Sequence, residues 1–345
     1  YAVDVDGEEG RWITITAAPD AQPVIEASGG NAIVVRGNYI EVSGFRIRGV
    51  GFDAENAYGW GILVRGSHHV RLADNVISDM AVGGITSVES AHLEVLYNEV
   101  YDNAFWGTEQ GSGISFWRNI DFGLPPDADG YHDRVVGNIV YRNENKVFSR
   151  WVEGSNAITD GNGIILDSSD ETAYEGRALV ANNVVFDNGG RGILVFEQSH
   201  VDVIHNTTFR NGRTESLAGG PVELGIRRSD DVRVFNNLSW ARPGVNPLQI
   251  DEVTNIVGGG NLLVADSSSG DITELDTLTT QDPGLVAPGV DPTLADFRPR
   301  PGSLALGHGI AISPALPFDA DEMPRSSARI DAGAYTLVDE TAADG

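Results

Sequence analysis

A short repeat runs through the middle of this chain and constrains its fold more than any other feature. Each copy starts with Gly-Ile, passes through an apolar strand, a polar turn and an alternating strand, and ends in Asn-x-Val/Ile. Three copies place the Asn 14 residues after the Gly, at positions 61 and 75, 84 and 98, and 192 and 206. Such regular self-similarity is typical of a stacked repeat protein.

A unit of this length cannot bury an apolar face alone, so the copies are expected to stack as coils of a solenoid. Strands rich in Val and Ile favour parallel sheets, and crossovers between parallel strands are right-handed. We therefore predict an all-β, single-domain, right-handed parallel β-helix with long loop insertions and a C-terminal capping segment. The Asn residues that end the copies should then form one column at a turn: Asn75, Asn98, Asn138, Asn183, Asn206, Asn237 and Asn261.

The repeat also predicts the domain boundaries. Residues 1–270 are expected to form the β-helix with an opening coil at residues 10–25, and residues 271–337 an irregular cap packed on the helix that covers its last coil. The last residues, 338–345, are expected to be a flexible tail. Long insertions interrupt the repeat at three places: residues 121–131, 143–162 and 170–176.

The alternation of each Gly-Ile strand assigns its side chains to two faces. Because the side-chain period of a strand is two, the first and third positions after the Gly point inward, as for Ile164 and Leu166. The second and fourth positions, Ile165 and Asp167, point outward. Equivalent side chains of successive coils should stack about 4.7–4.9 Å apart.

Charge and composition exclude several classes of function. The formal net charge is −27, from 50 acidic against 23 basic residues, so neither nucleic acid nor an anionic membrane surface is an expected partner. The chain has no cysteine, which excludes disulfides and thiol nucleophiles, and no apolar run long enough to span a membrane. We expect a monomer.

Over residues 10–265, the Gly-Ile…Asn-x-Val/Ile unit resembles the secreted right-handed β-helix proteins of the pectate-lyase-like superfamily. The stretches Arg298-Pro299-Arg300-Pro301-Gly302-Ser303 and Asp331-Ala332-Gly333-Ala334-Tyr335 are similar to a closing segment of bacterial secreted β-helices. The resemblance implies a carbohydrate-active protein that is secreted, on the cell surface or periplasmic, from a bacterium. Because the chain starts at Tyr1 without a signal peptide, we expect a processed or trimmed form.

A narrower resemblance involves residues 160–166, which read DGNGIIL. They are similar to the strand DGNGFKL of polysaccharide lyase family 9, in which the lysine is the catalytic base and nearby aspartates hold Ca²⁺. Ile165 stands at the position of that lysine, and the nearest acidic matches are Asp160 and Asp167. The base of that family is therefore not carried over to this chain.

The three insertions flank the same two coils, and loops on a rigid scaffold are where function concentrates. For β-elimination on a uronate, a cation must neutralise the sugar carboxylate and a base must remove the proton at C5. The candidate catalytic residues are Lys146, Asp160, Asp167, Arg191, Glu197 and His132. The candidate Ca²⁺ ligands are the oxygen-bearing Asp160, Asn162, Asp167 and Asp170. The candidate substrate-binding residues are Trp117, Arg118, Tyr131, Arg150, Trp151 and Asn162.

Two further hypotheses stay open for the same polysaccharide-binding groove. A glycoside hydrolase needs two carboxylates across the scissile bond, for which Asp167 pairs with Glu197 or with Asp160. A non-catalytic β-helix, such as an adhesin or a carbohydrate-binding scaffold, is the third hypothesis. Structural roles compete with each assignment: Lys146 as a solvated loop residue, the aspartates as turn formers, and the tryptophans as packing for the insertions.

Overall fold

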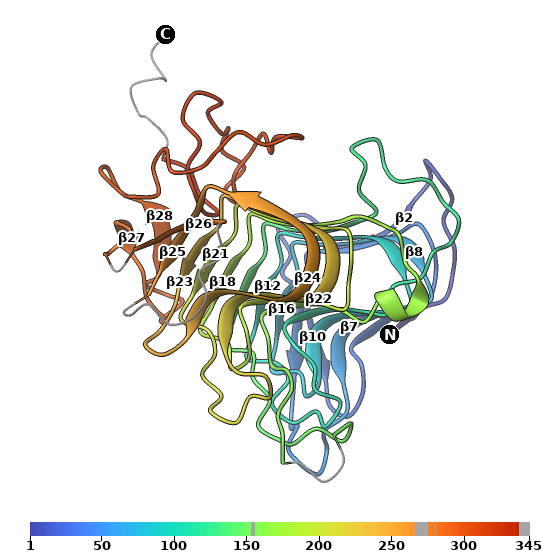
Figure 1. Ribbon diagram of the computed structural model, residues 1–345. Helices are drawn as coiled ribbons and strands as arrows, with labels where there is room; N and C mark the ends of the chain where they lie inside the picture. Colours follow the sequence, from blue (N-terminus) through green and yellow to red (C-terminus); the bar gives the residue numbers. More distant parts are fainter. Residues whose placement is uncertain (153–155, 266–274, 280, 338–345) are drawn as a thin grey trace.

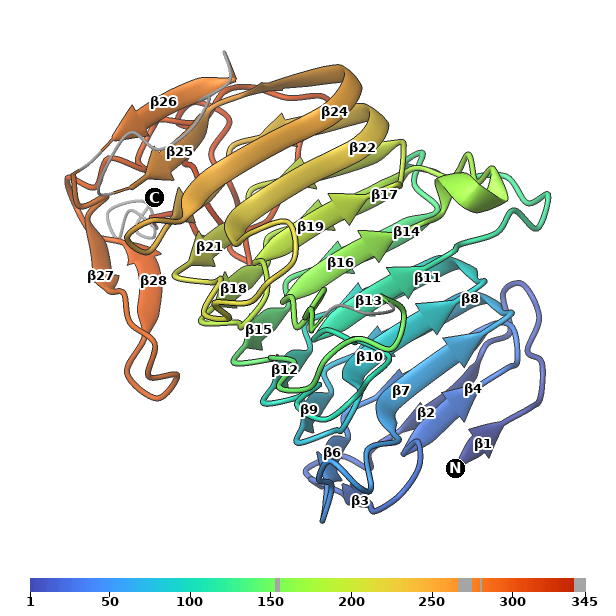
Figure 2. The ribbon, with the colours of Figure 1, turned by 60° about the horizontal axis from the view of Figure 1, so that its bottom comes forward.

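The computed structural model describes residues 1–152, 156–265, 275–279 and 281–337. It confirms the predicted parallel β-helix: successive coils stack along one axis, and each complete coil contributes three short strands (Figures 1 and 2). Two of the strand columns join into one 16-stranded sheet, and the third column forms a 10-stranded sheet. Helical structure in the described part of the chain is limited to one 3₁₀ turn, η1 (Asp170–Thr172).

The strand column that contains the Gly-Ile strands is called the first sheet, and the column that joins it in the 16-stranded sheet is called the second sheet. Adjacent strands of the first sheet all pair in parallel. Its strands are β1 (Ala2–Val3), β4 (Ile33–Val35), β7 (Trp60–Arg65), β10 (Gly83–Val88), β13 (Ile114–Trp117), β16 (Ile164–Asp167), β19 (Ile193–Phe196) and the first half of β22 (Val222–Phe235).

Along the chain, each strand of the second sheet follows one of the first sheet, through a short turn or, before β14 and β17, an insertion. β22 and its neighbour β24 (Asn246–Gly259) run through both sheets without a break. The other strands of the second sheet are β2 (Ile13–Thr16), β5 (Ile40–Ser43), β8 (His68–Ala73), β11 (Ala91–Leu96), β14 (Asp133–Val136), β17 (Ala178–Ala181) and β20 (Val201–Ile204).

The third sheet closes each coil. Its strands are β3 (Val24–Ala27), β6 (Arg46–Gly49), β9 (Val76–Ser78), β12 (Glu99–Tyr101), β15 (Ile139–Tyr141), β18 (Val184–Phe186), β21 (Thr207–Phe209), β23 (Leu238–Trp240), β25 (Asn261–Val264) and β26 (Asp276–Thr279). Aliphatic side chains from all three sheets fill the space between them in one continuous core.

The predicted register of the first sheet is confirmed. Ile164 pairs with the equivalent Ile of the coils on either side, and Asp167 pairs with Trp117 and Phe196. Ile164 and Leu166 lie in the core as expected. The outward-facing Ile165 is also buried, at 4% exposure. The reason is tertiary, because two loops cover this part of the outer face.

The predicted asparagine column forms, and it is a continuous chain of hydrogen bonds from Asn75 to Asn261. At each step the side-chain oxygen of one Asn accepts from both the main-chain N–H and the side-chain amide of its neighbour. For Asn98 and Asn138 these distances are 2.9 and 3.0 Å. The column therefore satisfies main-chain groups at the buried turn between the second and third sheets.

A second column, which the repeat analysis did not predict, follows the third sheet and comprises Asn103, Asn143, Asn188 and Asn211. It ends on a carboxylate, because the main-chain N–H and side-chain amide of Asn211 donate to Glu223 at 2.8 and 2.6 Å. Glu223 stands where the other copies of the repeat have Gly. Its burial raises the pKa of the Glu223 carboxyl to about 8.

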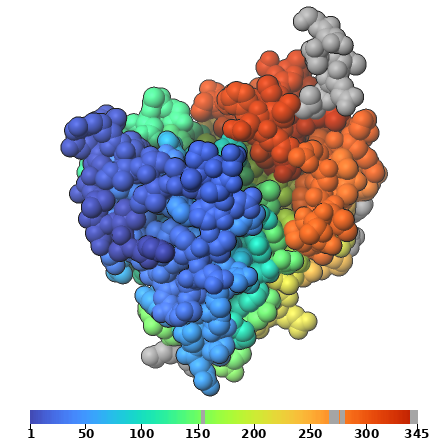
Figure 3. All heavy atoms as spheres, turned by 180° about the vertical axis from the view of Figure 1, so that it is seen from behind, coloured from blue at the N-terminus to red at the C-terminus, as the bar shows by residue number. Residues whose placement is uncertain are grey.

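The C-terminal segment packs on the helix, mostly along the outer face of the third sheet and less over its end. The ring of Phe297, on β28 (Asp296–Pro299), lies 5.1 and 5.3 Å from those of Phe186 and Phe209. β28 pairs with β27 (Leu285–Ala287) in a separate antiparallel ribbon, while β26 extends the third sheet past β25. In Figure 3 this orange and red segment forms a layer beside the coils. The expected tail, residues 338–345, lies outside the described residues.

Candidate functional site

Two loops meet over the outer face of the first sheet at β13, β16 and β19. One is the 143–162 insertion and the other comprises residues 213–221. Ile158 and Leu217 form a parallel bridge between the loops, and the N–H of Ala218 donates to the carbonyl of Ile158 at 2.8 Å. The two joined loops cover Ile165 and bury it, and polar residues lie at the edges of these loops.

Asp160 and Asp167 are two partly buried carboxylates that lie before and at the end of β16. Asp160 accepts from the Thr159 hydroxyl and the Asn162 amide, both at 2.8 Å, and Asp167 accepts from the Ser168 hydroxyl at 2.7 Å. Within the described ranges neither carboxylate forms an ion pair with a basic side chain. The negative charge of Asp160 therefore acts on Asp167 with little compensation.

Both carboxyl groups of this pair have raised pKa values. Burial raises the pKa of Asp160, and the charge of Arg191 offsets only part of the effect. Burial and the negative charge of Asp160 together raise the pKa of Asp167 to about 7, with a smaller contribution from Glu197. Asp167 is therefore near half-protonated at neutral pH, and a cation bound beside the pair would return both groups to the ionised form.

Asn162 and Arg191 fix Asp160 and the two covering loops. Asn162 is fully buried and donates to Asp160 and Ser112, while its oxygen accepts from the N–H of Arg191 at 2.8 Å. The guanidinium of Arg191 donates to the carbonyls of Thr159 and Ala218, one on each covering loop. Burial lowers the pKa of Arg191 to about 10. The structure thus engages Asn162, a candidate for binding substrate and Ca²⁺, and Arg191, a candidate catalytic residue, in positioning the loops.

Two other candidate residues, Asp170 and Glu197, form their contacts away from the carboxylate pair. Asp170 is exposed at the turn before the second sheet, where it accepts from the N–H and hydroxyl of Ser199 at 2.9 and 3.1 Å. The expected set of four cation ligands is therefore not assembled around Asp160 and Asp167. Glu197 pairs with Arg228 at 2.9 Å, and it reaches Asp167 only through its charge.

Trp117 occupies the outward row directly beside Asp167, as its strand pairing shows. Its side chain is 41% exposed, and the guanidinium of Arg118 lies 5.8 Å from the centre of its ring. Arg118 itself pairs with Glu171 of η1. Trp117 and Phe196 therefore flank Asp167 on the neighbouring strands, and Trp117 is the more exposed of the two.

The remaining candidates on the 143–162 loop lie toward solvent. The Nζ of Lys146 lies 3.9 Å from the centre of the Phe105 ring. Arg150 pairs with Glu109 at 2.6 Å and packs on Trp151, which is 62% exposed. These side chains line the outside of the loop that carries Asp160.

Tyr131 and His132 lie directly before β14 of the second sheet and do not join the other candidates, contrary to the prediction of one groove. The hydroxyl of Tyr131 is buried and donates to Asp202 at 2.7 Å. His132 packs beside His92, with ring centres 4.7 Å apart. The physical reason is that the 121–131 insertion folds over the second sheet, whereas the 143–162 insertion folds over the first.

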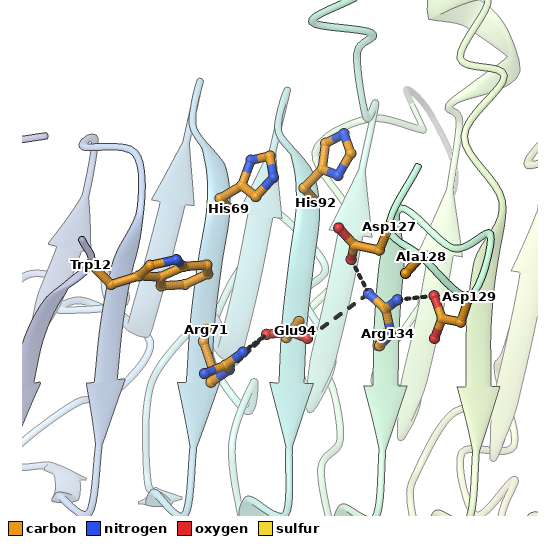
Figure 4. Close-up of a pocket in the computed structure, with 9 residues that line it drawn as sticks. All are labelled: Trp12, His69, Arg71, His92, Glu94, Asp127, Ala128, Asp129 and Arg134. Atoms are coloured by element: carbon orange, nitrogen blue, oxygen red, sulfur yellow. Dashed lines mark hydrogen bonds and ion pairs between the residues drawn. The ribbon is translucent and has the colours of Figure 1, made fainter. Parts of the chain in front are cut away.

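The second sheet carries a feature that the sequence analysis missed, a row of histidines at the start of successive strands (Figure 4). The rings of His69 and His92 stack in parallel, with centres 4.4 Å apart and an interplanar angle of 6°. Burial, together with the charges of the two neighbouring imidazoles, lowers the pKa of His92 to about 4. The spacing of His69 and His92 equals that of the Gly-Ile pairs at 61 and 84, which was the available signal.

This row borders a cavity of about 460 Å³ on the outer face of the second sheet. Arg71, Glu94 and Arg134 form a row of alternating charge along its floor, as Figure 4 shows. The lining residues are Trp12, His69, Arg71, His92, Glu94, Asp127, Ala128, Asp129 and Arg134.

No protein-family model matches the chain, and no curated protein is similar to it in sequence. Among solved structures, pectate lyase Pel9A is similar over 98% of this chain and 83% of its own, with a TM-score of 0.54 and 16% identity. The chain shares the fold of a pectate lyase. The Dettilon tailspike protein, at 11% identity, has a TM-score of 0.42 over 74% of this chain and 56% of its own. Lacto-N-biosidase of family GH136 from Eubacterium ramulus, at 15% identity, has a TM-score of 0.40 over 76% and 51%.

The likeness to pectate lyase Pel9A shows the right-handed β-helix fold, on which unrelated sites are built. Among the described residues, no helix has the length and apolar character needed to cross a membrane.

Proposed function

We propose that the protein is a secreted, monomeric polysaccharide lyase that cleaves a uronate-containing glycan by β-elimination on the outer face of its first sheet. The observation that carries this proposal is the pair Asp160 and Asp167, two partly buried carboxylates without an ion-pair partner among the described residues. The fold shared with pectate lyase Pel9A supports it.

The donors at this position fit Ca²⁺, which binds carboxylate, hydroxyl and water oxygens. Asp160 and Asp167 would hold the ion, and the hydroxyl of Ser168 lies beside them, 2.7 Å from a carboxylate oxygen of Asp167. A bound Ca²⁺ supplies positive charge that neutralises the uronate carboxylate and acidifies the proton at C5. In this proposal Asn162 and Arg191 are positioning residues, because they fix Asp160 and both covering loops.

Sugar binding is assigned to Trp117, whose exposed ring lies beside Asp167 and suits the apolar face of a pyranose. The base is assigned to the loop and not to the strand, because Ile165 is buried and has no group that accepts a proton. Lys146, the only lysine of the chain, lies on the same insertion as Asp160. It is the proposed base, with its side chain turned from the Phe105 ring toward the bound sugar.

A glycoside hydrolase is the second candidate, and one observation favours it. With its pKa raised to about 7, Asp167 is partly protonated at neutral pH, as a general acid requires. Asp160 or Glu197 would then serve as the second carboxylate.

One set of assays separates these functions. Uronate and neutral polysaccharides are incubated with the protein in Ca²⁺ and then in a chelator, and unsaturated sugar ends are followed by ultraviolet absorbance. We expect unsaturated products that vanish with the chelator, and a loss of roughly 100-fold or more in Asp160→Asn and Asp167→Asn. Asp170→Asn, which alters an exposed carboxylate of the neighbouring turn, is the matched control and should retain activity.

Each alternative gives a different result. New reducing ends without ultraviolet absorbance, unaffected by the chelator, would establish the hydrolase. Full lyase activity in Lys146→Ala would remove that residue as the base. A lack of any product across the panel, with bound oligosaccharide detected by calorimetry, would leave a non-catalytic carbohydrate-binding protein.

A further inference from the structure

We propose that the outer face of the second sheet binds a divalent transition-metal ion, such as Zn²⁺, through His69, His92 and Asp127. The ligand atoms that these three residues offer all lie within 4.8 Å of one another. The site is on a different sheet from Asp160 and Asp167, and the proposal does not depend on the proposed lyase activity.

The β-helix repeat brings the two imidazoles together. His69 and His92 occupy the same position in consecutive coils, on the paired strands β8 and β11. Both have left-handed backbone conformations, with φ of 53° and 51°, which turn their rings onto the outer face in the same way. The result is a parallel stack over two adjacent strands, as Figure 4 shows.

The 121–131 insertion supplies the carboxylate. Its last turn is closed by two main-chain hydrogen bonds, from Asp127 N–H to Tyr131 at 3.0 Å and from Gly130 N–H to Asp127 at 2.8 Å. Arg134 donates to one oxygen of Asp127, Oδ2, at 2.5 Å. The other oxygen stays available to a cation, and Arg134 orients the group in the way that outer ligands of metal sites do.

Each of the two histidines also has a ring nitrogen available to a metal ion. Nδ1 of His69 lies 2.9 Å from Nδ1 of His68, so that a hydrogen bond fixes this ring and leaves Nε2 for a metal. Nδ1 of His92 is buried and has no hydrogen-bond partner in the part of the chain that the structure describes. A buried ring nitrogen without a partner is uncommon in proteins.

The donor set selects the kind of ion. Two imidazole nitrogens and one carboxylate oxygen suit Zn²⁺ and its transition-metal neighbours, whereas Ca²⁺ and Mg²⁺ require mostly oxygen ligands. Bonds of about 2.0–2.2 Å require the donor atoms to approach one another more closely than 4.8 Å, and rotation of the side chains supplies this contraction. The adjoining cavity of about 460 Å³ leaves an open coordination position for water or another small ligand.

Tag-free protein provides a direct test, because the chain contains no cysteine to bind Zn²⁺. Calorimetric titration with ZnCl₂ and metal analysis after dialysis should show one tightly bound ion per chain that CaCl₂ does not displace. We expect the affinity to fall at least tenfold in His69→Phe, which keeps an aromatic ring in the stack, and in Asp127→Asn.

The matched control is Asp129→Asn, since Asp129 belongs to the same loop and also pairs with Arg134. This variant should bind Zn²⁺ as the unmodified protein does. Asp127→Asn changes a loop residue outside the core, so it provides the test even if His69→Phe does not fold. Absence of stoichiometric Zn²⁺ binding, or unchanged binding in Asp127→Asn, would overturn the proposal.

Discussion

At the scale of single residues, the position of Asp167 in its coil changes the pKa of its carboxyl group. The repeat places it in an outward row, in register with Trp117 and Phe196. Burial and the nearby charge of Asp160 raise its pKa from 3.8 to about 7. The folded protein therefore holds this proton more tightly than the unfolded chain. The associated stability is fully present below about pH 4 and is lost as the pH rises through about 7.

Asp167→Asn should accordingly stabilise the metal-free protein at high pH while removing activity. Asparagine keeps the shape of the side chain without the charge, so we expect the free energy of unfolding at pH 8 to rise by on the order of 1–2 kcal/mol after allowance for solvent screening. Near pH 4 the difference should largely disappear. Urea unfolding in a chelator at both pH values measures the effect, with Asp170→Asn as the control. An equal change at both pH values would contradict the assignment of this pKa.

At the scale of elements, the two asparagine columns stabilise the turns of the helix. The side chain of Asn138 accepts from Asn98 and donates to the carbonyl of Val95 at 2.9 Å, so each interior member satisfies several buried groups at once. Glu223 ends the second column with a carboxylate that accepts both donors of Asn211. Loss of one member leaves buried polar groups of its neighbours without partners, and each unpaired buried group has a desolvation cost.

Asn138→Ala should therefore be strongly destabilising. The substitution leaves the main-chain N–H of Asn98 and the carbonyl of Val95 without partners, and we expect a loss of about 2–4 kcal/mol in the free energy of unfolding. Ile139→Ala is the control, since this neighbouring side chain is 39% exposed and its loss should cost about 1 kcal/mol or less. Denaturant unfolding compares the two variants. Similar losses in both would show that the column contributes little.

At the scale of the whole molecule, the net charge of −27 is spread over a stack in which equivalent residues of neighbouring coils lie side by side. Some columns alternate in sign, such as Glu41, Arg71, Glu94 and Arg134 across the second sheet. The excess of carboxylates leaves a net self-repulsion that opposes the compact state.

Salt should therefore stabilise the protein. Raising NaCl from about 0.1 M to 1 M shortens the Debye length from about 10 to about 3 Å and screens this repulsion. We expect the Tm to rise by about 2–5 °C at pH 8 and by less near pH 4, where many carboxylates are protonated. Thermal unfolding followed by circular dichroism tests this. A Tm that falls with salt would indicate that the ion pairs outweigh the net repulsion.

The sequence by itself determined the β-helix, the register of its first sheet and the asparagine column through Asn138. These features depend on a short repeat whose coils contact only their neighbours, so a local pattern specifies them. It also directed attention to Asp160 and Asp167 through the DGNGIIL stretch.

Only the tertiary structure decided how the insertions distribute over the surface. The 143–162 loop joins residues 213–221 over the first sheet and buries Ile165, while the 121–131 loop carries Asp127 to the histidines of the second sheet. No repeat governs these loops. Their positions depend on contacts between residues far apart in the chain, such as Tyr131 with Asp202 and Ile158 with Leu217, which alternation and spacing do not encode.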